Sequence, residues 1–257
     1  MSIVNLPGLR IIPFKKYSAA FNMAADEYLL SLDQPILRFY GWENRTLSFG
    51  RSNFNPKGIN PDILKDSSTD KVKRLSGGKT VLHHHELTYN FCCNSDLFPA
   101  SILESYRLIS QPLADAFRQL GLAPEMKKTG KIKSETSICF KEVSSYEITL
   151  KQKKIIGSAQ YRRKKRFFQH GSIVIDIDWD FWHLTWNLPL DSQILKKRIT
   201  SIYEASGEKP GPDALMENIS DKFQKRFEVT ATIEEFSDQE YQGIGTLMNK
   251  YRWKGFE

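Results

Sequence analysis

Apolar residues recur every three or four positions from Ala19 to Leu32, and this period predicts an amphipathic helix. The same period runs from Ser101 to Leu120, where Gly121 supplies a helix stop and Pro112 predicts a kink. Two further helices are expected near the end of the chain, over residues 212–227 and 238–251.

Shorter apolar or alternating runs between these helices predict β-strands. They cover residues 36–40, 46–49, 71–74, 80–83, 87–92, 146–150 and 167–177. Strands followed by a mixed set of helices, with short connections, are typical of an α+β sheet domain. No segment has the composition of a linker, so we expect one domain over residues 1–257, with a helical C-terminal portion from about residue 187.

The composition is that of a globular protein, with 257 residues of which 40% are hydrophobic and 26% charged. No stretch approaches the roughly 20 apolar residues of a membrane span, and no signal peptide is evident, so we expect a cytoplasmic protein. Three cysteines, an odd number, argue against a disulfide framework. The absence of a CxxC pair gives little support for zinc, and no metal ligands are predicted.

Positive charge is concentrated in one region of the sequence. Residues 121–170 contain thirteen Lys or Arg and four Glu, a net charge of +9, whereas the rest of the chain sums to −2. Such a region favours docking of an acidic partner, although a set of solvated loops is an equal alternative. Nucleic acid is not expected, because the basic run has no interleaved aromatic residues.

Two glycines, Gly77 and Gly78, lie between two expected strands, shortly after Arg74 and Ser76. Glycine adopts positive φ and lets a ligand approach the backbone closely, as a buried acyl chain with a polar head requires. Arginine can bind a carboxylate, phosphate or carbonyl oxygen. The alternative is an ordinary hairpin with a surface arginine.

A lysine and a histidine are the next candidates for acyl chemistry. Lys154 directly precedes an apolar run that ends in small residues, and a fixed cation can stabilise the oxyanion of acyl transfer by about 3 kcal/mol. The alternative is a solvated lysine like its neighbours. His170, followed by Gly171 and Ser172, indicates close packing beside a pocket, or else a hydrogen-bonded core histidine.

Three consecutive histidines and one cysteine complete the candidates. If the strand continues through them, His83 and His85 share a face and His84 opposes them, but no further metal ligand can be named. Cys139 lies within the basic region, where nearby lysines favour its thiolate and could allow it to carry an acyl thioester. A single cysteine is otherwise a small core residue.

Taken together and in this order, these motifs resemble the lipoate-protein ligases and, more closely, the cysteine-dependent octanoyltransferases. The resemblance runs from about Asn22 to Asp176. It rests on residues 22–27, 37–42, 47–50, 73–74, 77–78, 81–83, 86–89, 154–160 and 169–172, with a weaker match at 250–253.

The resemblance implies the two-layer α/β catalytic-domain fold of biotin and lipoate protein ligases, a mixed β-sheet with flanking helices. Lys154 resembles the family's active-site lysine, which contacts the acyl carbonyl. The implied acyl site has one wall formed by Arg74, Ser76, Gly77, Gly78 and His83. The opposite wall is formed by Gly157, Ser158, Ala159, Gln160, His170 and Gly171.

Two mechanisms exist in this family. A transferase takes octanoate from acyl carrier protein, here through a thioester on Cys139, which matches the position of the nucleophile in cysteine-dependent transferases. It needs no cofactor, and its acceptor is a lysine of a lipoyl domain or of glycine-cleavage H protein. A ligase instead uses ATP and magnesium to make lipoyl-AMP. We expect the transferase, as a monomer without nucleic-acid or membrane partners.

The sequence departs from the ligase pattern at two positions. Lys79 stands where ligases often have glycine, and His84 stands where aspartate is common. The first change affects how a nucleotide phosphate or an acyl head is held, and the second, which affects magnesium or nucleotide geometry, leans slightly away from the ligase. A non-catalytic acyl-binding or cofactor-binding protein, and more weakly a biotin ligase, remain alternatives.

Overall fold

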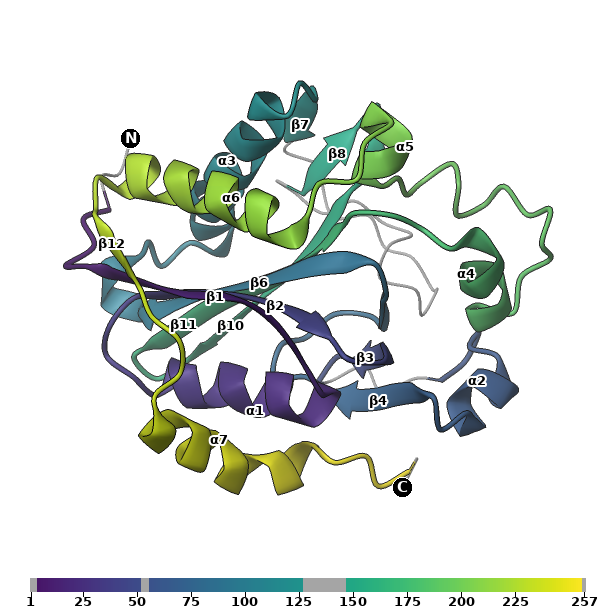
Figure 1. Cartoon of the computed structure of the whole chain (residues 1–257), viewed down its shortest axis with the longest axis horizontal. Helices are drawn as coiled ribbons and strands as arrows, with labels where there is room; N and C mark the ends of the chain where they lie inside the picture. Colours follow the sequence, from purple (N-terminus) through teal and green to yellow (C-terminus); the bar gives the residue numbers. More distant parts are fainter. Residues whose placement is uncertain (1–3, 52–55, 127–146, 256–257) are drawn as a thin grey trace.

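A six-stranded sheet forms the centre of the computed structural model, which describes residues 4–51, 56–126 and 147–255 (Figure 1). The strand order is β10-β11-β6-β2-β1-β12. Their bounds are β1 Leu9–Tyr17, β2 Ile36–Trp42, β6 Glu86–Asn94, β10 Ile156–Arg163, β11 Arg166–Val174 and β12 Ala231–Ile233.

The sheet mixes parallel and antiparallel pairs. β1 pairs in parallel with β2 and β12, whereas the pairs β2–β6, β6–β11 and β11–β10 are antiparallel. The parallel pair β1 and β2 is joined by the helix α1, Ala19–Leu30, because a parallel connection must cross the length of the sheet. The predicted α+β class and mixed sheet with flanking helices are confirmed.

Helices cover both faces of this sheet, adding a third layer to the two that were expected (Figure 1). On one face lie α1 and α7, Asp238–Tyr251, and on the other lie α3, Ile102–Gln119, and α6, Pro212–Phe227. Cys92 and Cys93 are neighbours on β6 and point to opposite faces, yet both are buried because each face has its own core.

The remaining elements form two small sheets and several short helices. Strands β3, β4 and β5 form one sheet, and β7, β8 and β9 form the other. Their bounds are β3 Arg45–Phe49, β4 Thr69–Lys73, β5 Val81–His83, β7 Pro124–Met126, β8 Ile148–Leu150 and β9 Lys153–Lys154. The short helices are α2 Pro61–Lys65, η1 Ser95–Leu97, α4 Trp179–Thr185 and α5 Ile202–Ser206.

Three features differ from the expectations. The consecutive strands β2 and β3 belong to different sheets, because the chain leaves the large sheet after Trp42. The C-terminal portion contributes a strand, β12, as well as helices. Strand β5 ends at His83 and His85 has φ 48°, so the predicted alternation of the three histidines is wrong. Within the described ranges, no helix is long and apolar enough to cross a membrane.

Candidate active site

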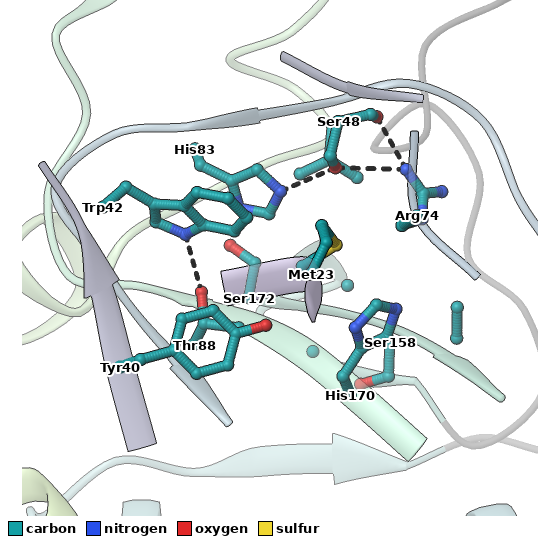
Figure 2. Close-up of a pocket in the computed structure, with 14 residues that line it drawn as sticks. Met23, Tyr40, Trp42, Ser48, Arg74, His83, Thr88, Ser158, His170 and Ser172 are labelled. Carbon is teal, nitrogen blue, oxygen red and sulfur yellow. Dashed lines mark hydrogen bonds between the residues drawn. The ribbon is translucent and has the colours of Figure 1, made fainter. Parts of the chain in front are cut away.

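A narrow cavity lies between α1, the end of β2, the small sheet of β3 and β5, and strands β10 and β11 (Figure 2). Its wall is mostly apolar, with a few polar groups facing inward. The lining residues are Met23, Tyr40, Trp42, Ser48, Arg74, Val81, His83, Thr88, Gly157, Ser158, Ala159, His170, Gly171 and Ser172. A cavity with an apolar wall and few polar groups suits an acyl chain with a polar head.

One side of the cavity carries a hydrogen-bonded histidine and carboxylate. His83 Nδ1 lies 2.7 Å from Glu86 Oε1, and His83 Nε2 lies 2.7 Å from Ser48 Oγ (Figure 2). Burial alone would raise the pKa of Glu86, but His83 and two hydroxyl donors hold it below its usual range. Glu86 is therefore an anion that orients the imidazole.

A second histidine and carboxylate pair lies across the cavity. His170 Nδ1 is 3.4 Å from Asp26 Oδ2, and His170 Nε2 is 2.6 Å from Ser76 Oγ. Asp26 also accepts hydrogen bonds from Arg38 and Tyr40, each at 3.0 Å. Burial lowers the pKa of His170 despite the aspartate beside it, so its imidazole remains neutral at pH 7.

The glycine-rich loop packs tightly around a buried arginine. Arg74 donates to the carbonyl oxygens of Gly77 and Lys79, at 3.0 and 2.6 Å, and to that of Ser48 at 2.6 Å. Gly78 has φ 98°, a conformation that favours glycine. A Cβ on Gly50 would lie 1.9 Å from the Gly78 carbonyl oxygen, so only glycine fits opposite the loop.

On the opposite wall, side chains from β10 and β6 pack so closely against β11 that position 171 requires glycine. A Cβ on Gly171 would lie 2.5 Å from Ser158 Oγ and 2.6 Å from Tyr89 Cε1. Tyr89 hydroxyl and Ser158 Oγ are 2.9 Å apart, which fixes the serine on β10 against β6. The absence of a side chain at Gly171 therefore keeps this part of the cavity open.

Lys154 lies outside the cavity lining, three residues before Gly157. Its Nζ is 2.7 Å from Glu147 Oε1, and both side chains are almost fully buried, at 1% and 4% exposure. The backbone of Lys154 is anchored on both sides, since its N–H donates to Arg198 and its carbonyl accepts from Thr200. The lysine side chain is thus fixed and buried at the end of β9.

The structure gathers seven of the predicted site residues around one cavity: Arg74, His83, Gly157, Ser158, Ala159, His170 and Gly171. It does not place Ser76, Gly77, Gly78, Gln160 or Lys154 in the lining. Ser76 lies behind His170, and Gln160 donates to Gln169 at 2.8 Å, away from the cavity. Cys139 lies outside the described residues.

Other functional side chains were missed in the sequence. Met23, Tyr40, Trp42 and Thr88 line the cavity, and all four stand within the segments that carried the family resemblance. The carboxylates Asp26 and Glu86 stand in the same segments. Position within those segments was the available signal, but it did not reveal which side chains face inward.

Cys92 and Cys93 are unsuited to nucleophilic catalysis. Burial raises the pKa of the Cys93 thiol to about 12 and that of Cys92 well above its usual value. Both thiols are therefore protonated at neutral pH, and the thiolate is the reactive form. Across the residues that the structure describes, no group of three or more His, Cys, Asp or Glu side chains is placed to hold a metal ion.

Residues 18–238 match the family described as the lipoyl protein ligase A/B catalytic domain. The chain belongs to this family. It is 34% identical to octanoyltransferase LipM of Clostridioides difficile (strain 630), over 95% of this chain and 96% of that protein. It is also 34% identical to octanoyltransferase LipM of Brevibacillus brevis, over 90% and 91% of the two chains. The predicted family and the predicted enzyme class, an octanoyltransferase, are confirmed.

Solved structures share the fold at lower sequence identity. A putative lipoate protein ligase from T. acidophilum with bound lipoic acid superposes with a TM-score of 0.76, at 18% identity and 95% coverage of both chains. Lipoate-protein ligase A bound with ATP gives a TM-score of 0.77, at 20% identity and the same coverage. These similarities confirm the predicted ligase-type fold.

Proposed function

We propose that this enzyme transfers an octanoyl group from acyl carrier protein to a lysine of a lipoyl domain or of glycine-cleavage H protein. The observation that carries the proposal is the narrow cavity that α1, the small sheet of β3 and β5, and strands β10 and β11 enclose, whose wall is built from the segments shared with the family. The relatives that span almost the whole chain are octanoyltransferases, and for this reason we propose octanoyl as the transferred group.

The proposed reaction proceeds through a thioester on Cys139. The other two cysteines are buried thiols with raised pKa values, whereas Cys139 stands in a segment rich in lysine, which favours the thiolate. Attack of the thiolate on the donor thioester moves the octanoyl group to Cys139 and releases the carrier thiol. Attack by the acceptor amine then forms the amide and frees Cys139.

Lys154 is proposed to stabilise the oxyanion of both steps. Its ammonium group carries three N–H donors, and the hydrogen bond to Glu147 Oε1 at 2.7 Å fixes its position. A buried cation acts in a low dielectric and needs no reorganisation, which makes it more effective than a solvated lysine. The ion pair with Glu147 holds the lysine in place.

A basic groove beside the cavity supports an acidic carrier protein as the donor. Seven basic residues line this groove: Arg51, Lys73, Arg74, Arg163, Lys164, Arg166 and Lys250. They come from four separate parts of the sequence, and Arg74 lines both the groove and the acyl cavity. Among the residues that the structure describes, Glu27 is the only acidic one in this lining.

Reversing the charge of Arg163 and Lys164 tests this docking surface. The double variant Arg163→Glu/Lys164→Glu is expected to raise the KM for carrier-bound octanoate about tenfold or more at low salt, because steering of the acidic carrier is lost. The KM for octanoyl-pantetheine should stay unchanged, since that donor has no acidic protein surface. Lys197→Glu/Lys225→Glu, with both residues exposed and outside the groove, is the matched control. Equal changes in the KM for both donors would contradict the proposal that this groove binds the carrier protein.

The proposed function is tested by mixing the enzyme with octanoyl-acyl carrier protein and an apo lipoyl domain, without ATP or magnesium. An increase in the mass of the lipoyl domain equal to one octanoyl group is expected. A requirement for ATP and magnesium with free lipoate would instead identify a ligase. Absence of acceptor modification under both conditions would favour a non-catalytic binding protein.

A further inference from the structure

A continuous chain of hydrogen bonds connects the acyl cavity to a buried carboxylate. Arg74 Nη1 donates to Ser48 Oγ at 3.2 Å, and Ser48 Oγ lies 2.7 Å from His83 Nε2 (Figure 2). His83 Nδ1 lies 2.7 Å from Glu86 Oε1. Ser48 and His83 both line the cavity, so the chain begins where substrate binds.

The chemistry of these groups assigns the direction of each hydrogen bond. A guanidinium can only donate, so Ser48 Oγ accepts from Arg74 and can give its own proton to His83 Nε2. The ionised Glu86 can only accept, which places the other imidazole proton on Nδ1. In the neutral imidazole, Nε2 is therefore the nitrogen that can receive a proton. When it does so, Ser48 Oγ still has a lone pair to accept from it.

Glu86 is itself fixed by several donors. Trp42 Nε1 and Thr88 Oγ1 donate to its Oε1 at 3.2 and 2.6 Å, and Ser172 donates to its Oε2. The Trp42 ring also stacks on the His83 imidazole, with centroids 4.1 Å apart. This arrangement prevents the imidazole from rotating and keeps Nε2 directed at Ser48.

We propose that Ser48 and His83 form the proton relay of acyl transfer, with Glu86 as the positioning residue. The inference rests on the proposed function. The acceptor amine attacks the thioester carbonyl, the C–N bond forms, and the C–S bond breaks with its electron pair on sulfur. The amine proton passes to Ser48 Oγ while the hydroxyl proton moves to His83 Nε2. His83 then releases the proton, which ends on the departing thiolate, so the products are an amide and a thiol.

Three variants test the relay in the transfer assay: Ser48→Ala, His83→Ala and Glu86→Gln. His83→Ala is expected to lower kcat for transfer by about 10²–10⁴-fold, the usual contribution of general acid–base catalysis, with little change in the donor KM. Added imidazole should restore part of the lost rate, because it can occupy the space left by the side chain and accept the proton. Ser48→Ala and Glu86→Gln should lower kcat in the same way.

The matched control is His85→Asn, at an exposed neighbouring histidine that does not line the cavity; asparagine accepts its φ of 48°, and the variant should keep the kcat of the unchanged enzyme. Glu86→Gln preserves the shape of the carboxylate, so it tests the relay even if His83→Ala unfolds. A full kcat in Ser48→Ala and Glu86→Gln, or a loss in folded His83→Ala that imidazole does not restore, would overturn the relay. Failure of the unchanged enzyme to modify the lipoyl domain would instead contradict the proposed function.

Discussion

Replacing Lys154 by methionine is expected to slow octanoyl transfer by about 10²–10³-fold, the usual effect of removing one oxyanion donor. It should also lower the free energy of unfolding by about 3–5 kcal/mol. The second effect follows from burial, because the Glu147 carboxylate is 4% exposed and would lose the ammonium group 2.7 Å away. Single-turnover rates and urea unfolding measure the two effects separately.

A double variant separates catalysis from stability. Lys154→Met/Glu147→Gln removes both charges, so the unpaired carboxylate disappears and much of the lost stability should return. Transfer should stay slow, because the oxyanion donor is still absent. If the double variant regained both stability and the full rate, Lys154 would have only a structural role.

Local patterns were sufficient to predict much of the fold. The long helices α1, α3, α6 and α7 have strong periodicity or clear end signals, and each is present close to its expected bounds. Strand β12 was missed because it has three residues, at most half-buried, and exists through its pairing with β1, more than 200 residues earlier. The position of β3 outside the main sheet likewise depends on long-range pairing.

In the candidate site, too, local motifs could be predicted from the sequence and long-range contacts could not. Gly171 and His170 could be predicted because they form a compact local motif. The carboxylate partner of His170 could not, since Asp26 reaches it across 144 positions of sequence, nor could the contact of Ser172 with Glu86, which spans 86. These contacts depend on the packing of α1 and the register of β6 with β11. Neither is encoded in a local pattern.

The largest effect on activity is expected at Cys139. Cys139→Ala should reduce transfer to the background rate, because the acyl group then has no thiolate to receive it. Cys93→Ala is the matched control, since its thiol is buried and its pKa of about 12 keeps it protonated. This control should load and transfer octanoate as the unchanged enzyme does.

The most direct test is to mix the enzyme with octanoyl-acyl carrier protein, without acceptor or ATP, and to locate the added mass by peptide mapping. The account predicts one octanoyl group on the peptide that contains Cys139, released by hydroxylamine and transferred when an apo lipoyl domain is added. Cys139→Ala should show neither loading nor transfer. Full transfer by Cys139→Ala would contradict the thioester mechanism.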